Sequence, residues 1–418
     1  MITDRPNRTV IRDVALIDAT GREPEGRVDA LVEDGRIARL GVVGEVAADV
    51  AVIDGAGTTL TPGLTDAHVH FALVGVKGDH GSDAWITHVL TVAEFIESAV
   101  QEGFTTVRDA GGLEPAWAHA VTAGKLRGPR ILPAGSPLSQ TGGHADDRQR
   151  HEALHHSQTI PGLVAGMEVV DGVDEVRRAA REQLRRGATQ IKLMASGGVI
   201  SPTDPLDSLQ LSVAEISVAV EVARSWGTYV MAHCHTTPSV EMALDAGVRS
   251  IEHGSMLEPG TAARIAAEGA FMVPTLQTME SFLAYPDRMG LAPEKIATLG
   301  DFAAQAYHSL EIAHGAGVKL ASGSDVVGPW QGRRGEEMVF KARVMGAHAA
   351  IISATRTNAE LFMLEDEIGT VEVGKRADLV LVKGEPLDDI SIMAEPENVV
   401  VVLQGGAVVK DSETRLAQ

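Results

Sequence analysis

The apolar positions of the central part of the chain alternate between short β-type runs and longer stretches with helical spacing. Strands are predicted at 105–108, 130–133, 190–194, 229–233, 248–252, 271–275 and 319–322. Helices are predicted at 92–102, 115–123, 173–186, 212–226, 238–246, 261–267 and 293–314. Sustained strand–helix alternation is typical of parallel α/β folds. The pattern therefore predicts a (β/α) barrel or a doubly wound sheet.

Both ends of the chain have a different pattern, with short β-prone runs separated by glycine-containing turns. These runs are 10–17, 29–32 and 36–42 near the N-terminus, and 377–382, 398–403 and 407–410 near the C-terminus. Glycine and proline are the strongest turn signals in a sequence. Strands at both ends of an α/β region predict that the two termini pair into one composite β domain.

Composition and charge narrow the classes of function. The 418 residues are 44% hydrophobic and 22% charged, which is ordinary for a globular chain with room for one large and one smaller domain. The formal net charge of -21 argues against a nucleic-acid surface, since phosphate binding needs clustered Lys and Arg.

The cysteine count and the apolar runs bear on the cellular environment. A single cysteine, Cys234, excludes a disulfide framework and a thiolate metal site. The first twelve residues are polar, and no apolar run approaches the roughly 18–20 residues of a membrane span. We therefore expect a cytoplasmic protein without a membrane partner.

The first candidate chemistry is the pair His68 and His70, which follows an apolar run that begins at Thr58. Residues i and i+2 of a strand point to the same face, so both imidazoles can face one metal ion. Two surface histidines would give the same short motif. Partners elsewhere in the chain must decide between these alternatives.

Four further residues lie in or at the ends of predicted strands: Lys192, His233, His253 and Asp325. Each has a simpler explanation, namely a lysine that reaches solvent, a histidine satisfied in the core, or an aspartate that caps a helix. Their coincidence favours a site, because parallel barrels carry their chemistry at the C-terminal ends of strands.

Four histidines and an aspartate are nitrogen and oxygen ligands that suit Zn²⁺ or a similar divalent ion. A buried lysine loses its proton readily, and the neutral amine of Lys192 can take up CO₂ to form a carbamate that bridges two ions. A bridging water would then have its pKa lowered towards about 7. Asp325 would bind one ion, accept the proton and pass it to the leaving amine.

This ordered set resembles the amidohydrolase superfamily with a binuclear metal centre. The segments 61–68 and 369–379 fit the same resemblance. It implies that His68, His70 and Asp325 bind one ion, that His233 and His253 bind the other, and that Lys192 bridges them as N6-carboxylysine. The implied fold is α/β: a (β/α)8 TIM barrel over 62–365, with a composite β-sandwich domain over 1–61 and 366–418.

The segments 103–109, 141–144 and 190–192 resemble the imidazolonepropionase-like branch, which includes Xaa-Pro dipeptidases and ochratoxinase-like amidohydrolases. The resemblance makes His144 a candidate for polarising the scissile carbonyl, with a solvent-facing loop histidine as the alternative. His235 could contact substrate or replace His233 as a ligand. Arg333 could clamp a substrate carboxylate or belong to a solvated loop.

The function that we expect is hydrolysis of the amide bond of a dipeptide or N-acyl amino acid by a metal-bridging hydroxide. One alternative is an ochratoxin-like aryl amide hydrolase, and another is a hydrolase of a cyclic amide or of a carbamate or urea xenobiotic. A metal-bound, non-catalytic binding protein is the alternative from another class. The sequence leaves the oligomeric state open, including a homo-oligomer.

Overall fold

The computed structural model describes residues 8–22, 26–75, 84–146, 148, 160, 162–199, 204–289 and 293–417. Within them the chain forms three sheets, of which one is mixed and two are parallel. No helix in the described part of the chain is both long enough and apolar enough to cross a membrane.

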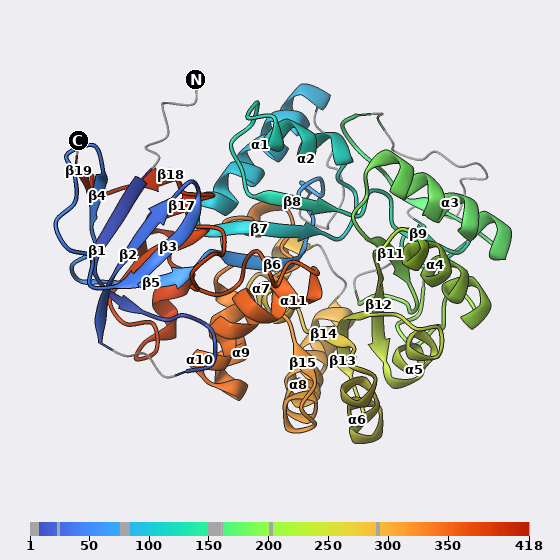
Figure 1. Cartoon of the computed structure of the whole chain (residues 1–418). Coiled ribbons are helices and arrows are strands. Elements are labelled where there is room, and N and C mark those ends of the chain that lie inside the picture. The colour runs from blue at the N-terminus through green and yellow to red at the C-terminus, as the bar shows by residue number, and fades with distance from the viewer. Residues whose placement is uncertain are drawn as a thin grey trace.

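The mixed sheet has nine strands and draws on both ends of the chain, whose blue and red strands lie side by side in Figure 1. Its main path has the order β18-β17-β16-β5-β1-β2-β3, β4 pairs with β1, and β19 pairs with β4. The strands are β1 (Arg8–Leu16), β2 (Arg27–Glu33), β3 (Arg36–Gly41), β4 (Ala51–Asp54), β5 (Thr58–Pro62), β16 (Leu379–Lys383), β17 (Val399–Gln404), β18 (Ala407–Asp411) and β19 (Leu416–Ala417).

The two ends of the chain meet at the antiparallel ladder of β5 and β16, where Leu60 pairs with Leu381. All of β5 and most of β16 are buried, as expected for central strands covered on both faces. Leu60 and Leu381 belong to one apolar core that also includes Ile11 of β1 and Leu403 of β17. This core fixes β5, and β6 follows after Gly63.

The parallel strands form a three-stranded sheet, β6-β7-β8, and a seven-stranded sheet, β10-β9-β11-β12-β13-β14-β15. They are β6 (Leu64–Val69), β7 (Phe104–Asp109), β8 (Arg130–Pro133), β9 (Leu138–Ser139), β10 (Glu168–Val169), β11 (Ile191–Met194), β12 (Val230–Thr236), β13 (Ser250–Met256), β14 (Phe271–Val273) and β15 (Lys319–Leu320). The prediction of a parallel α/β unit with an additional β domain is thereby confirmed in this general form.

Backbone hydrogen bonds outside these ladders connect the two parallel sheets on both sides of the three-stranded sheet. The Ala67 amide donates to the Ser322 carbonyl at 2.8 Å, which joins β6 to the segment after β15. The Thr189 amide donates to the Pro133 carbonyl at 2.8 Å, which joins β8, an edge strand of the three-stranded sheet, to the start of β11 inside the seven-stranded sheet.

The helices surround the parallel strands (Figure 1). They are α1 (Trp85–Gln101), α2 (Pro115–Thr122), α3 (Val173–Arg186), α4 (Val213–Ser225), α5 (Thr237–Asp245), α6 (Pro259–Glu268), α7 (Leu276–Ala284), α8 (Pro293–Gly315), α9 (Glu336–Met345), α10 (Ala347–Ile352) and α11 (Asn358–Leu361). Short helical turns are η1 (Pro286–Met289), η2 (Gly328–Trp330), η3 (Ser353–Thr357), η4 (Ile390–Ala394) and η5 (Pro396–Asn398).

The start of α1 differs from the prediction of a helix over 92–102, because α1 already begins at Trp85. Trp85, Ile86 and Leu90 are 45%, 66% and 63% exposed. Apolar residues on the solvent side hide the helical spacing of the buried face, so the pattern alone placed the start too late.

Candidate metal centre

The residues singled out by the sequence lie at one end of the parallel strands. His68 and His70 come from the end of β6, Lys192 from β11, His233 and His235 from β12, His253 from β13, and Asp325 from the segment after β15. The ring centroid of His68 lies 5.2 Å from that of His70 and 5.1 Å from that of His253. His253 in turn lies 4.5 Å from His233, so the histidines form one continuous cluster.

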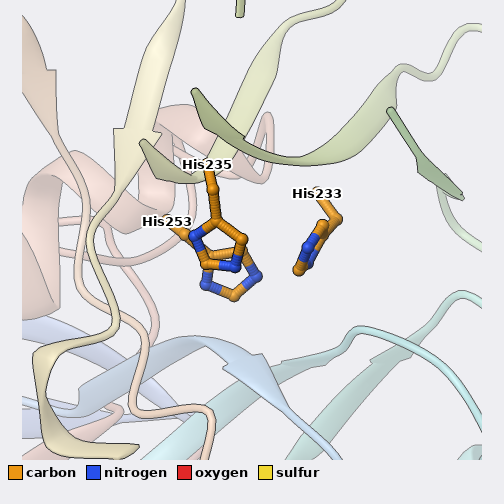
Figure 2. A group of neighbouring side chains, drawn as sticks. All are labelled: His233, His235 and His253. Carbon is orange, nitrogen blue, oxygen red and sulfur yellow. The ribbon is translucent and has the colours of Figure 1, made fainter. Parts of the chain in front are cut away.

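Strand register explains why Lys192 and His233 share a face. Lys192 pairs with Met231 and Met194 with His233 in the parallel ladder of β11 and β12, and neighbours in a ladder point to the same side. His233 and His235 are two residues apart and therefore also share a face. Figure 2 shows the rings of His233, His235 and His253 close together.

His253 reaches this cluster through an unusual backbone conformation. It pairs in register with Cys234, whose side chain lies in the apolar core, so regular alternation would turn His253 away from the cluster. Its φ of 72° breaks the alternation. Asp325 and Thr275 have similar left-handed φ values of 54°. Such conformations are costly for residues other than glycine and concentrate at functional sites.

Three of the clustered imidazoles are oriented by a hydrogen bond at Nδ1. The partners are Glu252 Oε2 for His68 at 2.6 Å, the Gly111 carbonyl for His70 at 2.9 Å, and Thr275 Oγ1 for His253 at 2.7 Å. Each bond leaves Nε2 free, and Nε2 of His68 and of His70 lie 3.6 and 3.4 Å from Asp325 Oδ1. Orientation of this kind is the usual arrangement for metal-ligating histidines.

Two groups of donor atoms are close enough to hold a metal ion, with all ligand atoms of each group within 4.8 Å of one another. One group is His68, His253 and Asp325, and the other is His233, His235 and His253. Burial lowers the pKa of His70 to about 4 and lowers that of His68 well below its usual value. A neutral imidazole has the free lone pair that a metal ligand needs, so the donor set fits divalent ions.

Lys192 and Asp325 have pKa values shifted by the same burial. Burial lowers the pKa of Lys192, although the charges of Glu252 and Asp325 raise it. Burial raises the pKa of Asp325 to about 7, although the charge of Lys192 lowers it. Lys192 is 1% exposed. Burial therefore favours the neutral amine of Lys192, which carbamate formation requires, and the Asp325 carboxyl can exchange a proton near neutral pH.

His144 lies against the cluster, with its ring stacked 4.3 Å from that of His233. Its backbone amide donates to Gln210 Oε1 at 2.7 Å, and its Nδ1 lies 3.8 Å from Asp204 Oδ2. A Cβ on Gly198 would stand 1.9 Å from His144 Cε1, so only glycine leaves room for the ring here. Burial lowers the pKa of His144 to about 4, against the charge of Asp204.

His235 joins the cluster from the other side and touches an apolar region. Its ring lies 4.8 Å from that of His253 and 5.3 Å from that of Phe302 in α8. Nδ1 lies 3.1 Å from Ser255 Oγ. Burial lowers the pKa of His235 to about 3. The ring is therefore neutral, with Nε2 available for an ion or a substrate.

Arg333 is engaged outside the cluster. It forms an ion pair with Glu336, and its Nη1 donates to the Tyr285 hydroxyl at 3.3 Å. Its side chain is 43% exposed. Its role as a substrate clamp stays a prediction.

Sequence reasoning missed Glu252 and Arg108, which are completely buried next to His68. Glu252 pairs in register with His233 and so lies on the same face of the sheet as Lys192. The signal that singled out Lys192, a charged residue inside an apolar strand, also applies to these two residues.

Comparison with known proteins gives a consistent result. The profile of the amidohydrolase family matches residues 59–409. Ochratoxinase from Aspergillus niger is 34% identical over 368 residues, which cover 84% of this chain and 75% of that protein.

Two solved structures are similar over almost the whole chain. A prolidase in complex with N-methylphosphonate-L-proline is 36% identical with a TM-score of 0.91, over 97% of this chain and 100% of the other. A Xaa-Pro dipeptidase with bound methionine is 31% identical with a TM-score of 0.86, over 96% of this chain and 100% of the other.

Proposed function

The chain belongs to the amidohydrolase family and is a hydrolase acting on C–N bonds, and from this premise we propose that it cleaves the amide bond of a dipeptide or an N-acyl amino acid. The observation that carries the proposal is the convergence of neutral imidazoles, a carboxyl and a buried lysine at one end of the parallel strands. The prolidase and the Xaa-Pro dipeptidase support a dipeptide, and the identity to ochratoxinase supports an aryl amide as the second candidate.

We propose that two divalent ions, most simply Zn²⁺, occupy the centre. His68, His70 and Asp325 would hold one ion, and His233 and His253 the other. Lys192 would stand between them as N6-carboxylysine: the lone pair of its neutral Nζ would form the N–C bond as one C=O π bond of CO₂ opens, and the proton lost from Nζ would pass to solvent, which leaves an anionic carbamate. When bound, the ions supply Lewis acidity for the amide carbonyl and lower the pKa of water.

The side chains of the protein divide the remaining work. Asp325, whose Oδ1 lies 3.6 Å from His68 Nε2 and 3.4 Å from His70 Nε2, would accept a proton from the attacking water and deliver it to the departing nitrogen. His144 is stacked on His233 and would donate a hydrogen bond to the carbonyl oxygen as negative charge develops there. His235 and Phe302 would contact the substrate beside the ions.

For the architecture we propose a closed (β/α)8 barrel over 62–365, with a composite β-sandwich of 1–61 and 366–418 beside it. The hydrogen bonds from Ala67 to Ser322 and from Thr189 to Pro133 support closure, since they join both edge strands of the three-stranded sheet to the seven-stranded sheet. A cytoplasmic location and the oligomeric state are proposals from the sequence alone.

The test is a screen of zinc-loaded protein against dipeptides, N-acyl amino acids and aryl amides, with the Asp325→Asn variant in parallel. We expect hydrolysis of at least one amide class, and a loss of kcat of about 100-fold or more in the variant, since general acid–base groups contribute 10²–10⁴-fold. A non-catalytic binding protein would bind such amides equally well with either residue and cleave none. That outcome would remove the hydrolase proposal for these substrates.

A further inference from the structure

We propose that Glu252, held in place by Arg108, is a positioning residue that sets the affinity of the metal position containing His68. The inference rests on the proposed metal centre. Glu252 is not one of the proposed ligands; it acts on the ion through the imidazole of His68, which its carboxylate orients.

The contacts around Glu252 leave its carboxylate no freedom to turn. Oε2 lies 2.6 Å from His68 Nδ1, and Arg108 Nη2 donates to Oε1 at 2.9 Å and to Oε2 at 3.1 Å. Ser250 Oγ donates to Oε1 at 2.5 Å. All four side chains are buried, so water does not compete for these bonds. The group connects three strands: β6, β7 and β13.

Arg108 is itself fixed from several directions. Its Nε donates to the Ala67 carbonyl at 2.6 Å, next to His68 in β6. The rings of Tyr229 and Phe362 each lie 5.9 Å from its guanidinium carbon. In this ion pair the Glu252 carboxylate oxygens act as hydrogen-bond acceptors.

The consequence for His68 is a fixed tautomer. Since Glu252 only accepts, Nδ1 of His68 must carry the proton, and Nε2 must carry the lone pair that faces Asp325. The other oriented imidazoles have neutral partners, a carbonyl for His70 and a hydroxyl for His253. An anionic partner makes an imidazole a stronger donor to a metal ion. Glu252 therefore favours the metal position that contains His68 over the position that contains His233.

The first experiment measures zinc binding to metal-free protein by competition with a chromophoric chelator, for the native chain and the Glu252→Gln variant. Outer partners of ligands typically contribute 10–100-fold to metal affinity. We expect a loss of this size for one of the two ions and a change of less than about threefold for the other, because His68 is the proposed ligand whose ring is hydrogen-bonded to the Glu252 carboxylate.

The matched control is Glu114→Gln, which makes the same chemical change in a buried carboxylate at the start of α2 that pairs with Arg186 of α3. We expect native zinc affinities for the control. Circular dichroism checks that each metal-free variant is folded. Native affinity for both ions in folded Glu252→Gln overturns the proposal, and so does an equal loss in Glu114→Gln.

A second set of variants separates positioning from a merely structural role. The double variant Glu252→Gln with Arg108→Met keeps a side-chain oxygen at position 252 that can accept from His68 Nδ1. It also removes the guanidinium, which would otherwise compete with His68 for that oxygen. We expect it to bind zinc more tightly than Glu252→Ala. In metal-free native protein, nitrogen NMR should show His68 protonated at Nδ1, and this tautomer should lose its preference in Glu252→Ala. Equal zinc affinities of the two variants, or an unchanged tautomer, contradict the proposal.

Ser250→Ala gives a milder variant for the case that changes at Glu252 prevent folding. It removes one hydrogen bond to Oε1 and leaves the charges intact, and we expect a loss of a few-fold in the same affinity. An unchanged affinity contradicts the proposal. None of these measurements needs a substrate, so a failure to cleave amides and a failure of this inference are separate results.

Discussion

At the scale of single residues, the ring nitrogens of the two β12 histidines distinguish their roles. His233 Nε2 lies 3.1 Å from the Gly197 carbonyl, which leaves Nδ1 for an ion. His235 has the opposite arrangement, with Nδ1 next to Ser255 Oγ and Nε2 free. His233 lies between His144 and His253, whereas His235 also touches Phe302. This arrangement favours His233 as the ligand and His235 as the substrate contact.

We therefore predict different defects for His233→Ala and His235→Ala. The first should lose at least one ion per chain and reduce kcat/KM by about 100-fold or more, because even outer partners of ligands contribute 10–100-fold. The second should keep both ions and mainly raise KM. Metal analysis and steady-state kinetics check both expectations. If the His235→Ala protein lacks an ion, His235 is a metal ligand rather than a substrate contact, and the proposed roles of the two histidines must be reversed.

The pKa of Asp109 predicts a pH dependence of stability. This carboxyl is fully buried and accepts hydrogen bonds from the amides of Phe71 and Gly111. Burial raises its pKa from 3.8 to about 7. Since the folded state then binds the proton more tightly, this contribution to stability is complete below pH 3.8 and is lost as the pH rises through 7. The full difference corresponds to at most about 4 kcal/mol.

In Asp109→Asn this pH-dependent part should be absent. Urea unfolding of the metal-free protein between pH 4 and pH 8 measures the difference, and the variant should show a flatter decline than the native chain. Parallel curves for the two proteins would refute the assignment. A constant difference in the free energy of unfolding between the two proteins would report the loss of one hydrogen bond, because the NH₂ group of the asparagine side chain cannot accept one.

At the scale of elements, α4 is the helix with the clearest local start signal. Ser212 is its N-cap, and the Glu215 amide donates to Ser212 Oγ while the Ser212 amide donates to Glu215. This capping box satisfies two backbone amides that the helix cannot pair by itself. The sequence analysis placed the start of a helix at Ser212 for this region.

Ser212→Ala should lower the free energy of unfolding by about 1 kcal/mol, the usual value for an N-cap. Ser225→Ala, near the other end of α4, is the matched control. Its hydroxyl only donates to the Val222 carbonyl within the helix, so its loss should have a smaller effect. Chemical denaturation of both variants provides the comparison, and equal losses would show that the cap is not the cause.

Other elements could not be predicted from their local pattern. Sequence analysis assigned no helix to α7 or α9, although both are regular helices in the structure. α7 buries Gln277 and Ser281, and α9 buries Glu337 and Lys341, so polar residues face the core in both. The charged residues of α9 have partners in other elements: the backbone amide of Gln277 in α7 donates to Glu337, and Lys341 donates to the Ser353 hydroxyl in η3. Hydrophobic spacing cannot reveal a buried face that is satisfied by distant partners.

At the scale of the whole molecule, the candidate ligands connect β6, β11, β12, β13 and the segment after β15. Binding of metal to the folded state alone should therefore stabilise the whole chain. A free ion at 100 times its dissociation constant contributes about 2.7 kcal/mol. We predict that chelation lowers Tm by several degrees and that added zinc restores it.

The control for this prediction is Lys192→Met, which cannot form the proposed carbamate and should have weaker metal binding. Its Tm should respond much less to chelation. Calorimetry or circular dichroism at one fixed scan rate makes the comparison, because unfolding of a protein of this size can be irreversible. A Tm of the native chain that is insensitive to chelation would contradict the role of the ions in holding these strands together.

The sequence by itself determined the parallel α/β unit, the β-rich ends of the chain, and the residues that gather at the candidate centre. These features follow from residue type and short-range spacing: apolar periodicity for the elements, and charged or imidazole side chains at strand ends. His68 and His70 are two residues apart, so their sharing of one strand face also follows from short-range spacing.

Only the tertiary structure decided which groups orient these residues. The left-handed φ of His253 overrides strand alternation, and Glu252 becomes the partner of both His68 and Arg108 only because β13, β7 and β6 meet around one interior. Separations of 142 residues and more along the chain divide such partners. No local pattern encodes a contact over that distance, because it depends on how strands twist, align in register and close on one another.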